Sequence, residues 1–556
     1  MSMTQAPAQL PLEMLYHWAD AQADAVYLRQ PKEGRWHTYS WRQVLEQAAR
    51  LVSGLHALGL APGDRVGLLS KNCAEWFICD FALQMGGYVS VPIYPTAGED
   101  TVRYVLEHSE CRALFIGKLD DPQQQAGGIP EGLVRIAMPY KSGIPVEHHW
   151  DELLAGHEPW GERPVPDADG LMSLVYTSGS TGQPKGVMIS FGAYGAACRG
   201  IVQTASLTGE DRAFSYLPLA HITERVYILG ASLYGGLPVA FAQSLDTFID
   251  DVKTISPTLF ISVPRLWANF RSRILEKLPQ GKLDILLRIP LLSGLVKKKV
   301  RAGLGLSQAR ILGCGSAPVA PSLLRWYEQL GMPITEAWGM TENLAYSTLN
   351  YPFRSDKVGT VGKPGVGVEI RVAEDGEVLC RCAGLMSGYY KDEEATANTL
   401  RNGWLHTGDQ GKLDDDGYLT ITGRVKDAFK TAKGKYVLPV PIEAMLVENA
   451  LIEQVCVIGS GLAQPVALVQ LGEGTDIRHK GALAERLANT LTKINDQLEK
   501  HQRLAGILVM KEPWTIENNI MTPTLKIKRH LLEQRYAEIE QRWIPGQHIL
   551  WEQDLH

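Results

Sequence analysis

The residues Tyr176-Thr-Ser-Gly-Ser-Thr-Gly-Gln-Pro-Lys-Gly-Val187 form the most informative stretch of this sequence. The apolar run 171–176 precedes them and predicts a buried strand that enters a loop. Glycines let backbone N–H groups turn toward an anion, and hydroxyls and a lysine add donors and positive charge. Gly-Lys-Ser/Thr, which marks a Walker loop, is absent. The pattern favours a phosphate-binding loop, although a polar surface turn has the same composition.

Length and charge limit what the whole protein is. The chain has 556 residues, more than the roughly 250–300 at which a single core stops growing, so at least two domains are expected. The formal net charge of −6 argues against a broad surface for nucleic acid. No basic and apolar leader opens the chain, and the eight cysteines are scattered, so we expect no signal peptide and no disulfide framework. These features predict a cytoplasmic protein.

The order of elements predicts an α/β fold. Helices and strands alternate up to about residue 170, which is typical of a parallel sheet covered by helices. One of these helices is expected to begin with a cap at Ser40. From about residue 358 short strands separated by Gly/Asp turns indicate a small, barrel-like β-subdomain. A compact α+β tail follows, with a long helix expected from Gly481 to about Gln502. We therefore expect a large N-terminal domain over residues 1–425 and a smaller, mobile C-terminal domain over residues 426–556.

Two segments raise the question of membrane contact. Residues 226–245 carry no charge and are nominally long enough to span a bilayer. Because Gly235-Gly-Leu-Pro238 interrupts them, we expect a buried helix, a turn and a strand. Residues 275–306 combine many leucines with Lys297-Lys-Lys-Val-Arg301. Such an amphipathic segment either packs on its own domain, with the lysines solvated, or lies on an anionic membrane surface.

Further candidate residues follow predicted strands. His221 stands in an apolar entry to the uncharged segment, where it is either a structural histidine or part of a pocket wall. The small residues 313–318 follow another strand and leave room for a flat ligand. Trp338, Thr341 and Glu342 bring together an aromatic ring, a hydroxyl and a carboxylate, which suit a base, a phosphate and Mg²⁺ respectively.

The sequence as a whole resembles the AMP-forming acyl-adenylating superfamily. The resemblance covers nearly the whole chain, in the order and spacing of five motifs: residues 176–187, 338–342, 403–409, 423–427 and the segment around Lys526. Residues 217–225, 430–443 and 521–529 are most similar to long-chain fatty acyl-CoA synthetases of the bacterial type. The resemblance implies a ligase that uses ATP, Mg²⁺ and coenzyme A to activate a fatty acid.

The resemblance also implies a role for each candidate residue. The β- and γ-phosphates of ATP would be held by Thr177, Ser178, Gly179, Ser180, Thr181, Gly182 and Lys185. The adenine would be flanked by Gly315, Ser316, Ala317, Pro318 and Trp338, with Gly339 in the same ATP-binding set. Thr341 would contact the α-phosphate, Glu342 the Mg²⁺, and Asp409 and Arg424 the ribose. The catalytic residues would be Lys526, Thr341, Glu342 and His221.

The implied reaction has two steps. A fatty carboxylate attacks the α-phosphate and releases pyrophosphate, and the thiol of coenzyme A then attacks the acyl-adenylate and releases AMP. Lys526 would neutralise charge in the first step, and the tail domain would rotate about Lys426 for the second. Two positions depart from the superfamily: Trp338 replaces the commoner tyrosine, and Leu525 replaces a glycine before the lysine. The second departure leaves Lys528 as the alternative to Lys526.

Other functions stay open on the sequence alone. An acyl-AMP ligase would pass the acyl group to a carrier-protein thiol instead of coenzyme A. A nucleotide or lipid sensor would keep the fold without activity, and a membrane-docking scaffold would rest on residues 275–306. The sequence leaves open a homodimer, a peripheral position at the inner membrane surface, the acyl chain length and the residues that contact coenzyme A.

Overall fold

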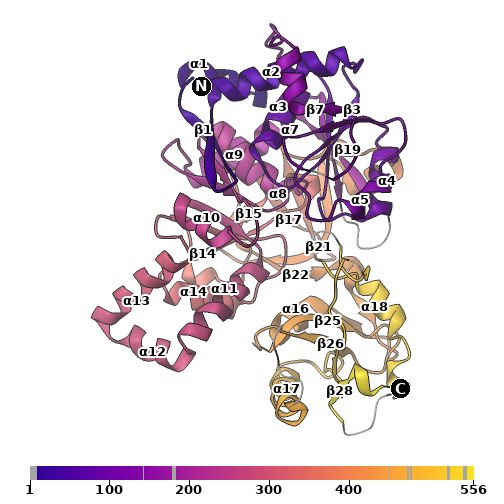
Figure 1. Ribbon diagram of the computed structural model, residues 1–556. Coiled ribbons are helices and arrows are strands. Elements are labelled where there is room, and N and C mark those ends of the chain that lie inside the picture. The colour runs from indigo at the N-terminus through magenta and orange to yellow at the C-terminus, as the bar shows by residue number, and fades with distance from the viewer. Residues whose placement is uncertain are drawn as a thin grey trace, which may run out of the picture.

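The computed structural model describes residues 9–141, 143–177, 183–449, 451–472, 475, 479–516, 518–522, 526–542 and 547–555. Within them the chain forms a large N-terminal part, a small antiparallel sheet and a smaller C-terminal part (Figure 1). Two helices, α12 (Gln280–Arg288) and α13 (Pro290–Gly303), project at the lower left of Figure 1, beside the C-terminal part in orange and yellow. The predicted α/β fold, with its large N-terminal sheets and smaller C-terminal domain, is confirmed.

The first large sheet has eight strands, in the order β19-β9-β8-β4-β3-β5-β6-β7. Strands β4, β3, β5 and β6 are parallel, as the alternation of helices and strands predicted. The strands are β3 (Arg65–Leu69), β4 (Val89–Ile93), β5 (Cys111–Ile116), β6 (Val134–Ala137), β7 (His148–His149), β8 (Leu171–Thr177), β9 (Lys185–Ser190) and β19 (Gly388–Tyr389). Because β9 returns antiparallel to β8, residues 178–184 join the ends of these two strands.

Helices cover this sheet, and their ends follow from the sequence. The backbone N–H of Gln43 donates to Ser40 Oγ and the Gln43 side chain accepts from the Ser40 N–H, which gives the predicted cap. Every residue of α3 is buried, as expected of a helix inside a core. The helices are α1 (Pro11–Ala21), α2 (Trp41–Ala57), α3 (Ala74–Met85), α4 (Glu99–His108), α5 (Gln123–Ala126) and α6 (Trp150–Gly156).

The second large sheet has nine strands, in the order β16-β15-β14-β13-β12-β10-β11-β1-β2. Its strands are β1 (Val26–Lys32), β2 (Arg35–Ser40), β10 (Ala213–Ser215), β11 (Val239–Phe241), β12 (Leu259–Ser262), β13 (Ile311–Cys314), β14 (Ile334–Trp338), β15 (Thr348–Leu349) and β16 (Lys363–Pro364). The associated helices are α7 (Phe191–Ala205), α8 (Ile222–Glu224), η1 (Arg225–Gly230), α9 (Ala231–Gly235), α10 (Phe248–Ile255), α11 (Pro264–Lys277) and α14 (Pro321–Gln329). Strands β10 to β14 pair in parallel, so their carboxyl ends lie at one edge.

Most of the uncharged segment 226–245 is part of the protein core, as predicted, whereas Leu245 at its end is exposed. It forms the end of a π-helix, then α9, a turn and β11, and residues 226–237 are all buried. None of the helices in the described residues has the length and apolar character needed to span a bilayer.

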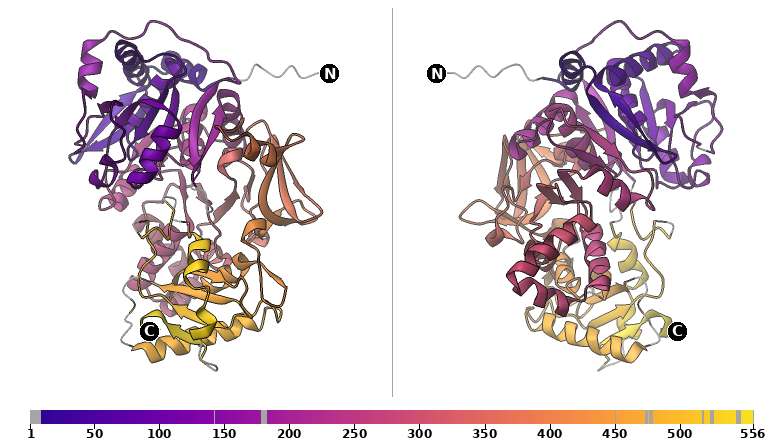
Figure 2. Two further views of the ribbon diagram at one scale, coloured as in Figure 1. Left: turned by 90° about the vertical axis from the view of Figure 1, so that its right-hand side faces the viewer. Right: turned by 60° about the vertical axis from the view of Figure 1, so that its left-hand side comes forward.

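A small antiparallel sheet lies beside the junction of the two larger parts (Figure 2, left). It contains β17 (Val368–Val372), β18 (Glu377–Cys382), β20 (Leu400–Arg401), β21 (Trp404–Leu413) and β22 (Leu419–Arg424), with α15 (Glu393–Thr399) between β19 and β20. The sheet occupies the region expected for the β-subdomain. Its β21 and β22 carry Asp409 and Arg424, so its position matters for the predicted site.

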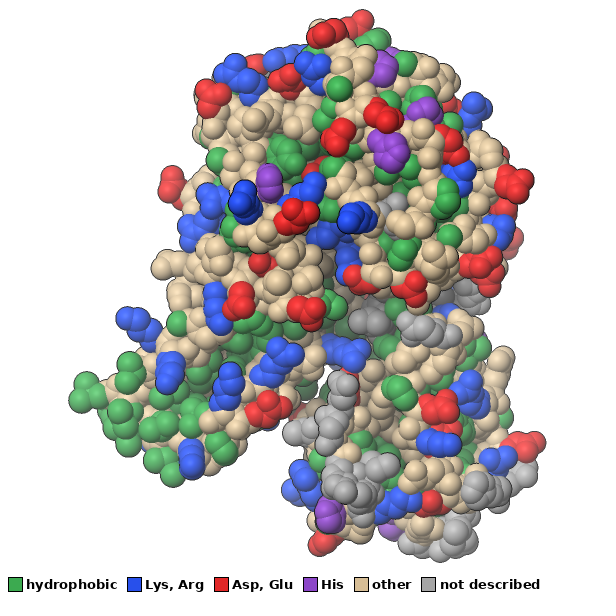
Figure 3. All heavy atoms as spheres, in the orientation of Figure 1, with side chains coloured by type: hydrophobic (Ala, Val, Ile, Leu, Met, Phe, Trp, Pro, Cys, Tyr) green, Lys and Arg blue, Asp and Glu red, His purple; other side chains and the backbone are tan. Residues whose placement is uncertain are grey.

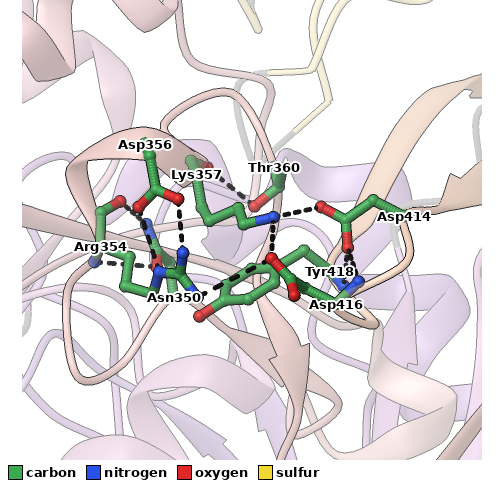
Figure 4. Close-up of polar contacts among 8 residues, drawn as sticks. All are labelled: Asn350, Arg354, Asp356, Lys357, Thr360, Asp414, Asp416 and Tyr418. Carbon is green, nitrogen blue, oxygen red and sulfur yellow. Dashed lines mark hydrogen bonds and ion pairs between the residues drawn. The ribbon is translucent and has the colours of Figure 1, made fainter.

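Charged side chains fasten the β21–β22 turn to the N-terminal part (Figure 4). Lys357, in the 3-10 helix η3 (Ser355–Lys357), binds Asp414 at 2.8 Å and Asp416 at 2.6 Å. The ammonium of Lys357 also lies over the ring of Tyr418, 5.0 Å from its centroid. Backbone hydrogen bonds of 2.7 and 2.8 Å join residues 361 and 362 to Leu419. These contacts hold β21 and β22 against the nine-stranded sheet.

The C-terminal part has a separate core built from residues 429–555. Its sheet has the order β25-β26-β27-β28, and a two-stranded ribbon precedes it. The elements are the 3-10 helix η4 (Val425–Asp427), β23 (Phe429–Lys430), β24 (Tyr436–Val437), α16 (Pro439–Leu446), β25 (Ile452–Ile458), β26 (Val466–Leu471), α17 (Lys480–Asn495), β27 (Gly506–Val509), α18 (Arg529–Arg535), η6 (Ile539–Arg542), β28 (Ile549–Trp551) and η7 (Glu552–Asp554).

One predicted helix is shorter than expected. The sequence pattern predicted a helix from residue 481 to about 502, but α17 ends at Asn495. The Asn495 side chain accepts from the N–H of Leu504 at 2.8 Å and donates to the Leu504 carbonyl at 3.0 Å. These two bonds turn the chain back, so that Leu498 and Leu504 are buried in the core. A local side-chain bond to the backbone thus competes with helix continuation.

Candidate active site

A cavity of about 770 Å³ opens where the sheets and the C-terminal part meet. Its volume is within the range of roughly 300–1,000 Å³ that is usual for small-molecule sites. The predicted residues that line it are Thr177, Lys185, His221, Gly315, Ser316, Trp338, Gly339, Thr341, Glu342, Arg424, Lys426 and Lys526. Segments far apart in sequence therefore meet at one cavity.

The predicted phosphate loop is only partly described. Thr177 ends β8 and Lys185 begins β9, and both line the cavity. The five residues between them that we expect to bind phosphate, Ser178, Gly179, Ser180, Thr181 and Gly182, lie outside the described residues. Lys185 binds Asp392 at 3.1 Å, and its ammonium lies 4.9 Å from the centroid of the Tyr389 ring.

Trp338, Asp409 and Arg424 form a hydrogen-bonded group at the predicted ribose site. The indole N–H of Trp338 donates to Asp409 Oδ2 at 2.8 Å, and Arg424 Nε donates to Oδ1 at 2.9 Å. The Asp409 residue is only 6% exposed. Its two carboxylate oxygens are thus held from both sides, which fixes their direction. The sequence suggested stacking for Trp338 and gave no sign of this hydrogen bond.

Thr341 and Glu342 begin the 3-10 helix η2 (Thr341–Asn343), which follows β14 after Gly339 and Met340. The buried Glu342 carboxylate accepts a hydrogen bond of 2.7 Å from the Tyr389 hydroxyl. Burial and this neighbouring charge raise the pKa of Tyr389 well above its ordinary value. Tyr389 was not among the predicted residues. It reaches the site because β19 pairs with β9, with Tyr389 opposite Val187.

His221 faces the cavity with a defined tautomer. The backbone N–H of Thr223 donates to His221 Nδ1 at 3.2 Å, so Nδ1 is the acceptor and Nε2 carries the proton. Burial, with the nearby charge of Lys526, lowers the pKa of His221 to about 3. The imidazole is therefore neutral at physiological pH and presents an N–H donor to a ligand. Of the two interpretations of the sequence, the pocket wall is the one the cavity agrees with.

Lys526 projects into the cavity from the C-terminal part. Its backbone N–H donates to Thr522 Oγ1 at 3.1 Å, and Leu525 lies outside the described residues. The Lys526 side chain is reached by solvent through the open side of the cavity, and protein atoms of the cavity walls lie around it on its other sides. This enclosure and the charge of Arg424 lower the pKa of the ammonium, while Asp409 and Glu342 oppose that shift.

Lys528, the alternative lysine, is not among the residues that line the cavity. Its ammonium donates to Asn519 Oδ1 in the same part of the chain. Arg529 binds both oxygens of Glu443, at 2.6 and 3.0 Å. The Lys526 segment is thereby fixed to α16 within the C-terminal part.

The structure separates the residues that were predicted to flank the adenine. Gly315 and Ser316 line the cavity, whereas Ala317 and Pro318 are exposed and are not among its lining residues. Gly339 has no room for a side chain, because an added Cβ would lie 2.5 Å from the Ala345 carbonyl carbon. Close backbone packing of this kind needs glycine. Lys426 lines the cavity from η4, at the start of the C-terminal part.

An apolar arm extends from the polar end of the cavity. It is lined by Ile201, Ala205, Leu207, Tyr227, Leu259, Ile261, Ile311, Leu349 and Tyr351. These side chains come from α7, η1, β12, β13 and β15, and from the loops that follow α7 and β15. The arm can take an apolar chain whose polar head faces His221 and Lys526. No spacing in the sequence marks this set, because its members come from distant segments.

The described residues contain no group of three or more His, Cys, Asp or Glu side chains arranged to hold a metal ion. Among the described residues that line the cavity, Glu342 is the one buried carboxylate, and Asp375, Glu377 and Asp427 are more exposed. Mg²⁺ commonly uses one or two carboxylates together with substrate phosphates. One buried carboxylate beside the predicted phosphate loop is therefore compatible with Mg²⁺ bound along with a nucleotide.

The fold and the cavity define a two-part α/β protein whose cavity has a polar end and an apolar arm. The model of the AMP-binding enzyme family matches residues 15–390, and that of the AMP-binding enzyme C-terminal domain matches residues 426–543. The chain belongs to the AMP-binding enzyme family.

Curated relatives match along most of their length. A peroxisomal long-chain acyl-CoA synthetase of Arabidopsis thaliana is 31% identical, over 94% of this chain and 84% of that protein. A long-chain-fatty-acid–CoA ligase of Mycobacterium bovis is 30% identical, over 92% of this chain and 93% of that protein.

Solved structures share the fold. An anthranilate CoA ligase in complex with anthranoyl-AMP has a TM-score of 0.78 at 23% identity, and covers 98% of this chain and 100% of its own. The adenylation domain of a carboxylate reductase from Mycobacterium chelonae has a TM-score of 0.81 at 21% identity, over 97% of this chain and 91% of that one.

Proposed function

We propose that this protein is a long-chain fatty acid–CoA ligase that forms AMP. It activates a fatty acid with ATP to an acyl-adenylate and pyrophosphate, and then transfers the acyl group to coenzyme A, releasing AMP. The names of the relatives that match over most of the chain support this assignment. The observation that carries it is one cavity in which a polar end, Lys526 and an apolar arm meet.

ATP is proposed to bind at the polar end. The loop from Thr177 to Lys185 would hold the β- and γ-phosphates, and Trp338 and Gly315 would flank the adenine. Asp409 would accept hydrogen bonds from the ribose hydroxyls, since each carboxylate oxygen has a second lone pair beyond those used by Trp338 and Arg424. Thr341 would donate to the α-phosphate.

Mg²⁺ is proposed to bind with ATP at Glu342, the buried carboxylate at this end of the cavity. The ion would neutralise part of the phosphate charge. Tyr389 holds the Glu342 carboxylate in place through the hydrogen bond at 2.7 Å. The protein therefore contributes a carboxylate that is already held in position for the ion.

The fatty acid is proposed to lie in the apolar arm, with its carboxylate at His221. The neutral imidazole keeps its proton on Nε2, so it can donate to the carboxylate without neutralising it. Burying an alkyl chain releases about 0.8 kcal/mol per methylene. That gain supplies the affinity, while His221 and Lys526 set the position of the head group.

In the first step a carboxylate oxygen bonds to the α-phosphorus, and the bond from that phosphorus to the bridging oxygen of pyrophosphate breaks. Negative charge collects on oxygens around the α-phosphorus, where the ammonium of Lys526 would stabilise it. No residue needs to form a covalent intermediate.

In the second step the thiol sulfur of coenzyme A bonds to the acyl carbon, and the bond from that carbon to the AMP oxygen breaks. The thiol proton is released to solvent, so the products are the thioester, AMP and a proton. We propose that residues 426–556 turn about Lys426 between the steps, because Lys526 fills part of the cavity. The boundary between residues 425 and 426 belongs to this proposal.

The test measures pyrophosphate and AMP release with ATP and fatty acids of increasing length, with and without free coenzyme A. We expect pyrophosphate release to rise with chain length and steady AMP release only with coenzyme A. Lys526→Ala should abolish pyrophosphate release, while Lys528→Ala, the matched control, should retain it.

Acyl-adenylate that accumulates without turnover would point instead to a carrier-protein thiol. Equal background rates in Lys526→Ala and the parent would indicate a non-catalytic sensor. A homodimer and a cytoplasmic position stay predictions.

A further inference from the structure

The helical pair α12 and α13 exposes an unusual number of large apolar side chains. Twelve large hydrophobic residues are exposed in the described part of the chain, and five of them lie between residues 285 and 295. They are Ile285, Ile289, Leu291, Leu292 and Leu295. Leu291 is 90% exposed and Leu295 is 63% exposed. Figure 3 shows apolar atoms gathered at the end of this projection, at the lower left. We call these five residues the apolar tip.

The exposure is not the result of a loosely attached hairpin. On its inner side Leu283 is buried, and Leu287, Val296 and Val300 pack against the core cluster of α11 and α14. The indole N–H of Trp326 donates to Gln280 Oε1 at 2.9 Å. The inner side therefore fixes the pair to the protein, and the apolar tip is left without a partner in the described chain.

Positive charge surrounds the apolar tip. Residues 277–303 contain seven lysines and arginines and one acidic residue, Asp284, in a chain with a net charge of −6. Asp284 accepts a hydrogen bond of 2.7 Å from Gln280. Lys298 and Lys299 are exposed and follow the tip along α13. Blue side chains border the apolar end in Figure 3.

We propose that α12 and α13 dock this protein on an anionic lipid bilayer. The apolar tip enters the boundary between head groups and acyl chains, and the flanking lysines and arginines contact the anionic head groups. Helices α12 and α13 project from the body of the protein (Figure 1), so their outer end is open to a flat surface. A second copy of the chain is a poorer occupant, because it would bring the same positive charge against this face.

The proposed docking recruits the protein and does not open a route for the acid. The hairpin packs on the cluster that contains Phe260 and Leu312, whereas their neighbours Leu259 and Ile311 line the apolar arm. Side chains alternate along a strand, so the nine-stranded sheet separates the hairpin from the arm. Docking is therefore independent of the proposed catalytic steps.

The experiment is flotation of the full-length protein with vesicles. One set contains phosphatidylglycerol and phosphatidylcholine in equal amounts, and the other contains phosphatidylcholine alone. We expect the parent protein to float with the anionic vesicles and less with the neutral ones. Leu291→Asn with Leu295→Asn should abolish flotation. Lys298→Gln with Lys299→Gln should weaken binding roughly 25-fold, on the basis of about fivefold per charge near an anionic surface. Added salt should weaken the parent in the same direction.

Two control variants test whether position matters. Leu245→Asn changes a leucine that is 82% exposed elsewhere on the surface, and Lys412→Gln removes an exposed charge from β21. Both should float as the parent does. All variants should keep the parent's melting temperature and its activity on a short, water-soluble fatty acid, because the changed residues lie away from the cavity. This activity distinguishes failed docking from failure of the proposed function.

Three results would overturn the inference. The parent does not float with anionic vesicles, or the Leu291→Asn and Leu295→Asn protein floats as well as the parent. The third is a parent that forms dimers by sedimentation, which the leucine variant loses, without binding to vesicles. That result would assign the tip to self-association.

Discussion

Replacing Trp338 by phenylalanine should affect stability and nucleotide binding by different amounts. Phenylalanine keeps an aromatic face for the adenine and removes only the indole N–H. That N–H donates to Asp409 Oδ2 at 2.8 Å, and the carboxylate is 6% exposed. A hydrogen bond to a charged group contributes about 1.5–3 kcal/mol. Because this bond exists without nucleotide, its loss should lower the free energy of unfolding by that amount.

The effect on binding should be smaller. Arg424 still holds Asp409 Oδ1 at 2.9 Å, so the carboxylate keeps one of its two fixed contacts. Nucleotide binding must then order one side chain again, at a cost of about 0.5–1.5 kcal/mol. The dissociation constant for AMP should therefore rise roughly twofold to tenfold.

The assay is titration calorimetry with AMP, together with denaturant unfolding followed by circular dichroism. Trp326→Phe is the matched control, because its indole N–H donates at 2.9 Å to the neutral Gln280 far from the cavity. It should lose about 0.5–1.5 kcal/mol of stability and bind AMP as the parent does. The reasoning is refuted if Trp338→Phe binds AMP as tightly as the parent, or if its stability is unchanged.

Three further predictions concern buried groups at and near the cavity. Burial raises the pKa of Glu336 from 4.5 to about 8, so the folded protein holds a proton that the unfolded chain loses, and stability falls as pH rises through that window. Glu336→Gln should make the melting temperature fall less steeply with pH between about 4.5 and 8, and an unchanged slope would contradict this prediction. Glu224 should account for the fall that remains, because burial also raises its pKa to about 8. His221→Ala should lower kcat/KM for the fatty acid roughly 10- to 100-fold, through loss of one donor to a carboxylate. The acid limb of the pH profile should keep its shape, because the pKa of His221 is about 3 and the ring stays neutral above it; a limb that moves contradicts this. Ala205→Trp fills the apolar arm and should shift the preference to shorter acids, with kcat/KM falling about fourfold for each methylene that loses its buried place; an unchanged length profile would remove Ala205 from the arm.

Much of the fold follows from local patterns. The cap at Ser40, the parallel strands β3, β4 and β5 and the buried segment after His221 were all predicted, because each depends on residues close together in sequence. The end of α17 was not predicted, because it depends on a hydrogen bond between Asn495 and Leu504, nine residues further along the chain.

The candidate site was predictable where each motif is contiguous. Trp338, Thr341 and Glu342 stand within five residues, and Lys526 was selected by a family resemblance. Tyr389 could not be found in this way. It reaches Glu342 through strand pairing between segments about 200 residues apart. The apolar arm was equally hidden, because its walls come from α7, β12 and β13.

The fastening of the β21–β22 turn by Lys357 has a consequence for the order of chemical events. Asp409 and Arg424 lie upstream of Lys426, on strands anchored to the N-terminal part. If residues 426–556 turn away after the first step, Asp409 and Arg424 keep their place and their proposed contacts with the ribose. The acyl-adenylate would then stay bound while residues 426–556 change position. It would therefore have little chance to be hydrolysed before the thiol of coenzyme A reaches it.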